Sequence, residues 1–310
     1  MIAGRGRALR RLTMAIAVLS CLAMSTLAER PPIPPTRVPA SAEALGPPVL
    51  AGLRLSVPSE RAVPRIIPKK ITQRLDRYLA TRPGRVTAMV TDLTTSRSYR
   101  YHDDERMITA SAAKAQILMA LLLKTPWRDL PAAVRRDAES MIRYSDNHAA
   151  DRLWLRIGGA PGFTETGEQL GLRHTRGVPG ACVDLYCWGI TKTSAQDQIR
   201  LMRALVSPGS PLPAKARRRV LGLMGKVVDG QDWGIGVARC AGDRVALKNG
   251  WLRRVSDKRW AVASVGLVRG HGQAFAIAVL TEGSANVATG IATVEGVTER
   301  AMRSFRKCPR

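Results

Sequence analysis

The order of strand-like and helix-like segments constrains the fold most. Alternating or β-branched runs predict strands at 86–93, 98–102, 244–248, 260–268 and 274–280. Apolar residues at helical spacing predict helices at 71–79, 110–124, 132–144, 149–157, 163–170, 193–205, 214–224 and 287–306. A capping box from Thr193 to Gln196 starts one of them. Because helices split the strands into two groups, we expect an α/β (α+β) fold, with an antiparallel five-stranded sheet flanked by helices plus an all-helical lobe.

The residues before this region predict an exported protein. Residues 1–28 combine four arginines, an apolar stretch and small residues at Thr26 and Ala28, which is typical of a cleaved signal peptide. An uncleaved anchor, or lipid attachment at Cys21, is the alternative for a membrane-anchored form. Residues 29–69 hold ten of the chain's 19 prolines, so we expect a disordered tether there. Residues 70–310 then form the folded domain.

The cysteines agree with an oxidising compartment. Four remain after cleavage, and they allow three pairings. We expect Cys182 to pair with Cys187 and Cys240 to pair with Cys308. No histidine stands at ligand spacing near them, so we expect no metal site and no cofactor.

The strong positive charge limits the classes of binding partner that we expect. The chain carries 49 Lys and Arg against 24 Asp and Glu, and removal of the leader leaves a formal charge of +21. This balance favours anionic polymers such as those of a cell wall. No zinc-finger or aromatic RNA-binding motif accompanies the charge, so we expect no nucleic-acid partner. We expect a monomer.

Three short polar motifs lie at the boundaries between predicted helices and strands. Ser111 and Lys114 lie one turn apart at the start of an apolar helix, where an amine can take a proton from a serine nucleophile. Residues 145–147 read Ser-Asp-Asn between two helices, where a plain helix cap is the alternative interpretation. Residues 248–250 read Lys-Asn-Gly at the end of a predicted strand, where glycine allows backbone to approach a ligand.

Together and in this order, the motifs resemble the S-x-x-K, S-D-N and K-T-G set of class A β-lactamases and related penicillin-binding proteins. The resemblance spans about residues 71–306. It implies that Ser111 is the nucleophile and Lys114 its proton acceptor. It also implies that Ser145 passes a proton to the leaving nitrogen and touches Lys248.

The remaining motif residues are implied to bind substrate. Asn147 would hold a substrate amide, and Lys248 and Asn249 would lie beside the substrate carboxylate. Gly250 would let the backbone come close. The backbone N–H groups of Ser111 and Trp251 would form the oxyanion hole. Asn249 replaces the usual Thr of the motif.

The resemblance breaks where class A enzymes carry a glutamate that activates the deacylating water. Residues 175–189 contain no Glu, and Asp184 is the one carboxylate in that stretch and a possible deacylation base. We therefore expect an exported serine hydrolase that opens a β-lactam or related amide through an acyl-serine and releases it slowly. The alternatives are a cell-wall D,D-peptidase acting on the peptidoglycan stem peptide, and a non-catalytic wall-binding protein.

Overall fold

The computed structural model describes residues 65–180 and 187–308, and its contacts assign all of them to one unit, Arg61–Arg310. The predicted signal peptide and nearly all of the predicted tether lie outside these residues. The elements are, in order, α1 (Pro68–Leu79), β1 (Arg85–Asp92), β2 (Ser98–Tyr101), β3 (Met107–Ile108), the 3-10 turn η1 (Ala110–Ala112), α2 (Ala113–Lys124), η2 (Trp127–Asp129), α3 (Ala132–Arg143), α4 (Asn147–Ile157), α5 (Gly159–Gln169), β4 (Lys192–Thr193), α6 (Ala195–Ala204), α7 (Ala214–Met224), η3 (Gly234–Ala238), β5 (Arg244–Arg253), β6 (Trp260–Gly270), β7 (Gln273–Ser284) and α8 (Val287–Met302).

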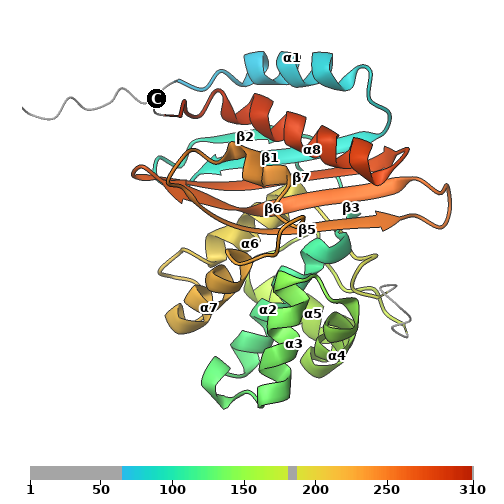
Figure 1. The fold of residues 1–310 in the computed structure, drawn as a ribbon, viewed down its shortest axis with the longest axis vertical. Coiled ribbons are helices and arrows are strands. Elements are labelled where there is room, and N and C mark those ends of the chain that lie inside the picture. Colours follow the sequence, from blue (N-terminus) through green and yellow to red (C-terminus); the bar gives the residue numbers. More distant parts are fainter. Residues whose placement is uncertain (1–64, 181–186, 309–310) are drawn as a thin grey trace, which may run out of the picture. The chain divides into compact units, whose positions relative to one another are not determined.

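The predicted antiparallel five-stranded sheet is confirmed, with strand order β2-β1-β7-β6-β5. Helices α1 and α8 cover one face, and α6 and the helical lobe lie on the other (Figure 1). Strand β7 shows why both faces are apolar. Phe275, Ile277 and Val279 pack into the core beneath α1 and α8, whereas Ala276 and Ala278 pack into the core shared with the lobe.

Helix α2 is the centre of the lobe. Ten of its twelve residues are buried, including a lysine, because α3, α4, α5 and α7 surround it. An apolar helix buried on all sides suits such a central position. The helix begins only at Ala113, because residues 110–112 form the tighter turn η1. Ser111 therefore precedes the α-helix instead of lying within its first turn.

Four details differ from the sequence-based expectation. Helix α1 starts at Pro68, whose fixed φ suits a first helical turn, so the folded unit includes residues assigned to the tether. The capping box is wrong: Thr193 belongs to β4, and Ser194 caps α6 by accepting from the Asp197 N–H. Residues 248–250 lie inside β5, which continues to Arg253, and do not end the strand. The short β3–β4 pair was not expected.

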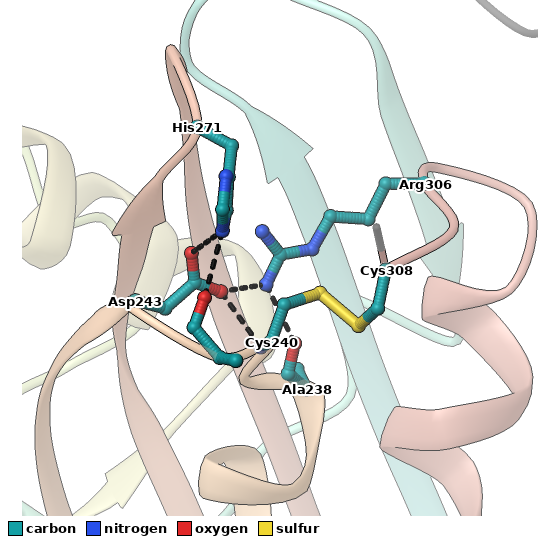
Figure 2. The surroundings of a disulfide bond; sticks show 7 residues. Ala238, Cys240, Asp243, His271, Arg306 and Cys308 are labelled. Atoms are coloured by element: carbon teal, nitrogen blue, oxygen red, sulfur yellow. Dashed lines mark hydrogen bonds and ion pairs between the residues drawn. A yellow bond between two sulfur atoms is a disulfide. The ribbon is translucent and has the colours of Figure 1, made fainter. Parts of the chain in front are cut away.

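The Cys240–Cys308 disulfide is confirmed and ties the chain end to the segment after η3 (Figure 2). Arg306 supports the same junction by donating to the Ala238 carbonyl at 2.7 Å and by pairing with Asp243. Cys187 is also disulfide-bonded. Its expected partner, Cys182, lies outside the described residues. None of the helices in the described part of the chain has the length and apolar character to cross a bilayer.

Removing the Cys240–Cys308 bond should destabilise the fold. The bond closes a loop with a sequence separation of 68 residues. Loss of that constraint in Cys240→Ala/Cys308→Ala should lower the free energy of unfolding by about 2–4 kcal/mol, measured by urea denaturation. The double variant is a cleaner test than a reductant, which would also open the bond at Cys187. An unchanged urea midpoint would contradict the prediction.

Candidate active site

A cavity of about 170 Å³ collects four of the residues that the motifs singled out. It is lined by Ala110, Ser111, Tyr144, Ser145, Asn147, Trp188, Gln231 and Trp251. These residues come from η1, the α3–α4 turn, β5 and two loops. The structure therefore brings Ser111, Ser145, Asn147 and Trp251 to one place, although they are far apart in sequence.

Backbone packing fixes Ser111 at this cavity. A Cβ on Gly250 would lie 2.4 Å from the Ser111 nitrogen and 2.8 Å from the Ala112 nitrogen, so only glycine lets β5 approach η1 this closely. Ala110 has a φ of +45°, a left-handed conformation that costs a non-glycine residue about 1 kcal/mol. Its N–H donates to the Gly189 carbonyl at 3.0 Å, which helps to hold the strained turn.

Lys114 is fully buried and points at the α3–α4 turn. Its amine donates to the Ser145 carbonyl at 2.6 Å and to Asn147 Oδ1 at 2.7 Å, and lies 3.2 Å from Ser145 Oγ. Its Nζ also lies 4.6 Å from the centre of the Trp188 ring. The spacing of Ser111 and Lys114 predicted a shared turn, but in the described residues every hydrogen bond of the lysine goes to Ser145 or Asn147 and none goes to Ser111.

The environment favours the neutral form of Lys114. Burial lowers its pKa most, and the charge of Lys248 lowers it further, while Asp146 and Asp151 oppose the shift. The resulting pKa is about 6. A neutral amine has two N–H groups and one lone pair. Since the Ser145 carbonyl and Asn147 occupy both donors, the contact with Ser145 Oγ is one in which the lone pair accepts from the hydroxyl.

Lys248 reaches the same serine from the sheet. Its Nζ donates to Ser145 Oγ at 3.0 Å and to the Asn249 carbonyl at 2.9 Å. Burial lowers its pKa to about 7. The Ser145 hydroxyl thus lies between two buried amines, which makes a continuous hydrogen-bonded path from Lys114 to Lys248.

The Ser-Asp-Asn turn serves both as a helix cap and as part of the cavity. Asp146 caps α4 by accepting from the Ala149 N–H at 3.0 Å, and it also accepts from Ser140 Oγ at 2.8 Å. The cap interpretation is therefore correct for Asp146. It leaves the side chains of Ser145 and Asn147 free for the cavity. Ser145 itself has a φ of +58°, which aims both its carbonyl and its hydroxyl at Lys114.

The side chain of Asn249 is held by a loop. It is buried beneath the loop before η3, where its amide nitrogen donates to the Gln231 and Trp233 carbonyls at 2.9 Å each. It does not line the cavity. Side chains alternate along a strand, so Asn249 faces away from Lys248 and Gly250. The Asn249 amide is thus bound to this loop, and its place beside a substrate carboxylate stays a prediction.

Tyr144, Trp188 and Gln231 line the cavity, but the motifs did not identify them. Trp188 is fully buried and donates from Nε1 to Asp151 at 2.7 Å, and its carbonyl accepts from the Thr109 hydroxyl at 3.3 Å. Tyr144 directly precedes the Ser-Asp-Asn turn, and this adjacency was the available signal. Trp188 and Gln231 come from loops with no motif of their own.

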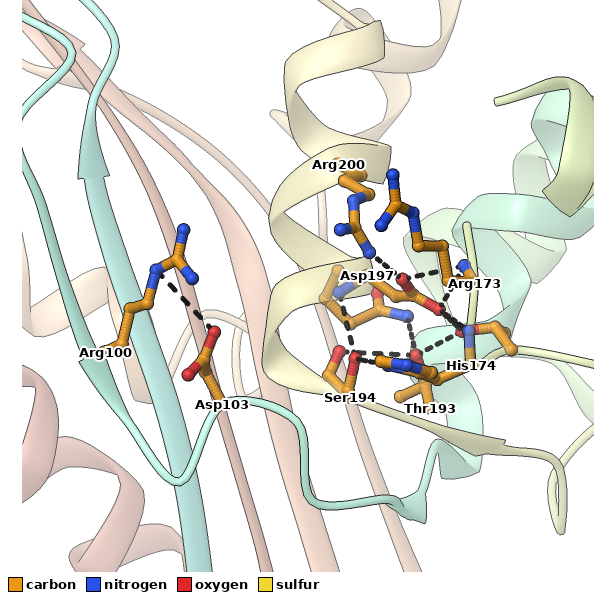
Figure 3. Close-up of polar contacts among 10 residues, drawn as sticks. Arg100, Asp103, Arg173, His174, Thr193, Ser194, Asp197 and Arg200 are labelled. Carbon is orange, nitrogen blue, oxygen red and sulfur yellow. Dashed lines mark hydrogen bonds and ion pairs between the residues drawn. The ribbon is translucent and has the colours of Figure 1, made fainter. Parts of the chain in front are cut away.

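A buried carboxylate anchors the loop that leads toward residues 181–186. Asp197 accepts from the backbone N–H groups of Arg173 and His174 and from the Thr175 hydroxyl, and it pairs with Arg200 (Figure 3). Burial alone would raise the pKa of Asp197, but these hydrogen bonds outweigh burial and lower it. Asp184, the possible deacylation base, lies outside the described residues, as does Cys182.

Comparison with known proteins decides the family. Residues 131–305, more than half of the chain, match the family described as the Beta-lactamase enzyme family. The chain belongs to this family. Ser111 and Lys114 precede the matched residues, so their assignment rests on the motif and on the geometry above. No curated protein sequence gives a significant match to this β-lactamase-family chain.

Solved structures share its fold. The structure of PBP-A is 22% identical, covers 78% of this chain and 98% of its own, and has a TM-score of 0.66. A class A β-lactamase from Mycobacterium abscessus is 21% identical, with coverages of 77% and 99% and a TM-score of 0.63. A variant of PBP-A, described as an acyl-enzyme complex with penicillin G, is 21% identical, with coverages of 76% and 96% and a TM-score of 0.64. At identities of 21–22%, these comparisons show a shared fold only.

The low pKa of Lys114 should be visible in protein stability. The unfolded chain holds the Lys114 proton up to about pH 10.5, whereas the folded protein releases it near about pH 6. Between these pH values the unfolded state binds more protons. The wild type should therefore gain stability relative to Lys114→Met as pH rises, by up to ~1.4 kcal/mol per pH unit.

Urea denaturation of both proteins at several pH values between 6 and 10 measures this difference. Leu118→Met changes another buried position of α2 without removing a titratable group, so its difference from wild type should not vary with pH. A pH-independent difference for Lys114→Met would show that the buried lysine keeps its proton.

Proposed function

We propose that this β-lactamase-family protein is an exported serine hydrolase that opens a β-lactam, or a related amide, through an acyl-serine intermediate. The observation that carries the proposal is the buried, hydrogen-bonded Lys114–Ser145–Lys248 path beside a cavity that Ser111 lines. Neither a lone Ser-Lys pair nor a lone helix cap would place two buried amines on one serine hydroxyl.

These groups are sufficient for every proton transfer of the acylation step. The Ser111 hydroxyl oxygen attacks the amide carbonyl carbon, and its proton passes to the lone pair of Lys114. The backbone N–H groups of Ser111 and Trp251 stabilise the oxyanion. When the carbon–nitrogen bond breaks, Ser145 gives its proton to the leaving nitrogen and is reprotonated from Lys114. Lys248, when protonated, attracts a substrate carboxylate and polarises Ser145.

We further propose that release of the acyl group is slow. The described lining of the cavity contains no carboxylate. Water is a poor nucleophile without a base, so the ester at Ser111 should persist unless Asp184 supplies one. This consideration also favours the second candidate, a cell-wall D,D-peptidase that penicillin would trap. The PBP-A variant described as a penicillin G acyl-enzyme has the same fold.

Export is part of the proposal. The leader-like residues 1–28 support it, and so does the Cys240–Cys308 disulfide, since such bonds persist in oxidising compartments. Recovery of the protein from outside the cytoplasm with Glu29 as its first residue would support export. Recovery only from the cytoplasm with Met1 retained would reject it.

Penicillin G should label Ser111. Mass spectrometry over time should show one adduct on the peptide that contains Ser111, formed faster than it is lost. Ser111→Ala should show none, while Ser98→Ala, at an exposed serine outside the cavity, should match wild type. Lys114→Ala should slow acylation by about 10²–10⁴-fold. Absence of label in folded wild type would reject the proposal. Rapid cleavage of a D-Ala-D-Ala peptide without β-lactam turnover would favour the peptidase.

The acylation rate should depend on pH with two limbs. Lys114 acts as a base only when neutral, so the rate should rise as pH passes about 6. Lys248 attracts a carboxylate only when charged, so the rate should fall above about 7. Both limbs belong to the coupled pair. Single-turnover acylation measured across pH checks this, and Lys248→Arg should lose the alkaline limb because arginine keeps its charge. A flat profile, or an alkaline limb retained in that variant, would contradict the assignment.

A further inference from the structure

A second, larger cavity lies outside the candidate active site. Its volume is about 670 Å³, and it lies between α7, η3 and the edge of the sheet formed by β5 and β6. Helix α7 packs against the edge strand β5, and Figure 1 shows α7 on the same side of the sheet as the helical lobe. None of the residues that line this cavity lines the cavity at Ser111.

The larger cavity is lined by cations that have no protein partner in the described part of the chain. They are Arg218, Lys226, Arg239, Arg244 and Arg269. About half of the other described arginines donate to a carbonyl or carboxylate, as Arg306 does nearby. The side chains of these five make no hydrogen bond and no ion pair among the described residues.

Arg244 and Arg269 make the arrangement costly without a ligand. They are directly opposite each other on β5 and β6, and like charges at such positions destabilise a sheet. The Nε of Arg269 is buried without a hydrogen-bond partner. Burial, and then the charge of Arg244, lower the pKa of Arg269. Arg244 is exposed to solvent whereas Arg269 is partly buried, so the unsatisfied hydrogen-bonding demand lies with Arg269.

The acidic residues at the cavity do not neutralise it. Asp243 uses one carboxylate oxygen, Oδ2, to pair with Arg306 and to accept from the Cys240 N–H, and its Oδ1 lies 3.9 Å from His271 Nε2 without a hydrogen bond (Figure 2). Asp229 and Asp232 are exposed on the loop before η3, and among the described residues neither forms an ion pair. Five cations therefore line the cavity with three carboxylates, one of which also pairs with Arg306, and this leaves an excess of positive charge.

We propose that this cavity is a binding site for an oxyanion ligand, bearing phosphate or carboxylate groups, held by Arg244 and Arg269 from the sheet and by Arg218 from α7. Guanidinium groups bind both anions through paired, charge-assisted hydrogen bonds. Such a ligand would satisfy the buried Nε of Arg269 and remove the repulsion between the two strands. The site is separate from the hydrolytic chemistry and does not depend on it.

Isothermal titration of the mature, disulfide-bonded chain tests the proposal, with inorganic pyrophosphate and citrate as separate probes. We expect one saturable site for at least one probe, and the preferred probe identifies phosphate or carboxylate as the ligand chemistry. Arg244→Gln/Arg269→Gln should weaken binding by about 10-fold or more. Arg136→Gln/Arg156→Gln removes two charges from exposed positions outside the cavity, and it should change affinity less than about twofold.

Two results would overturn the site. One is the absence of saturable binding of either probe at low ionic strength. The other is equal weakening by the control variant, which would show only diffuse charge attraction.

Arg218→Gln, on an exposed face of α7, tests the opposite wall and should also weaken binding. Without ligand, the sheet variant should unfold at the same or a higher urea concentration than wild type. A lower urea midpoint would show that the pair is structural.

Discussion

The hydrogen bonds from the buried amine of Lys114 to the turn between α3 and α4 are the interaction on which the site depends. They join the centre of the helical lobe to the Ser-Asp-Asn turn. The hydroxyl of Ser145 then reaches Lys248 on β5, so one serine connects lobe and sheet. Burying an amine is costly unless it loses its charge or gains partners. Here the apolar surroundings of α2 enforce the first and the turn provides the second.

The same arrangement explains why strained backbone conformations occur beside the cavity at Ser111. Ala110 and Ser145 both have left-handed backbone conformations, each costing of order 1 kcal/mol or more. Surrounding contacts hold each one: the Gly189 carbonyl accepts from Ala110, and the Asp146 cap secures the turn that contains Ser145. The strain orients polar groups toward the cavity. A relaxed backbone at Ser145 would turn its carbonyl away from Lys114.

The sequence predicted the parts of the protein that local pattern controls. Strand alternation gave five strands, and short motifs gave Ser111, Lys114, Ser145 and Lys248, because each motif is held by one turn or one strand. Trp188 and Gln231 could not be found this way, since long-range packing alone brings their loops to the cavity. The contacts of Asn249 were missed for a different reason: reading residues 248–250 as a strand end hid the alternation that turns it to the opposite face.

That alternation also gives a physical reason for asparagine at position 249. Its amide nitrogen donates to two carbonyls, those of Gln231 and Trp233, and so fixes the loop between them. A threonine has a single hydroxyl hydrogen and could satisfy only one of these carbonyls. The loop borders both cavities, because Gln231 lines the one at Ser111 while Asp229 and Asp232 line the basic one. Asn249 therefore supports the wall of the cavity at Ser111 through this loop, although its own side chain does not line that cavity.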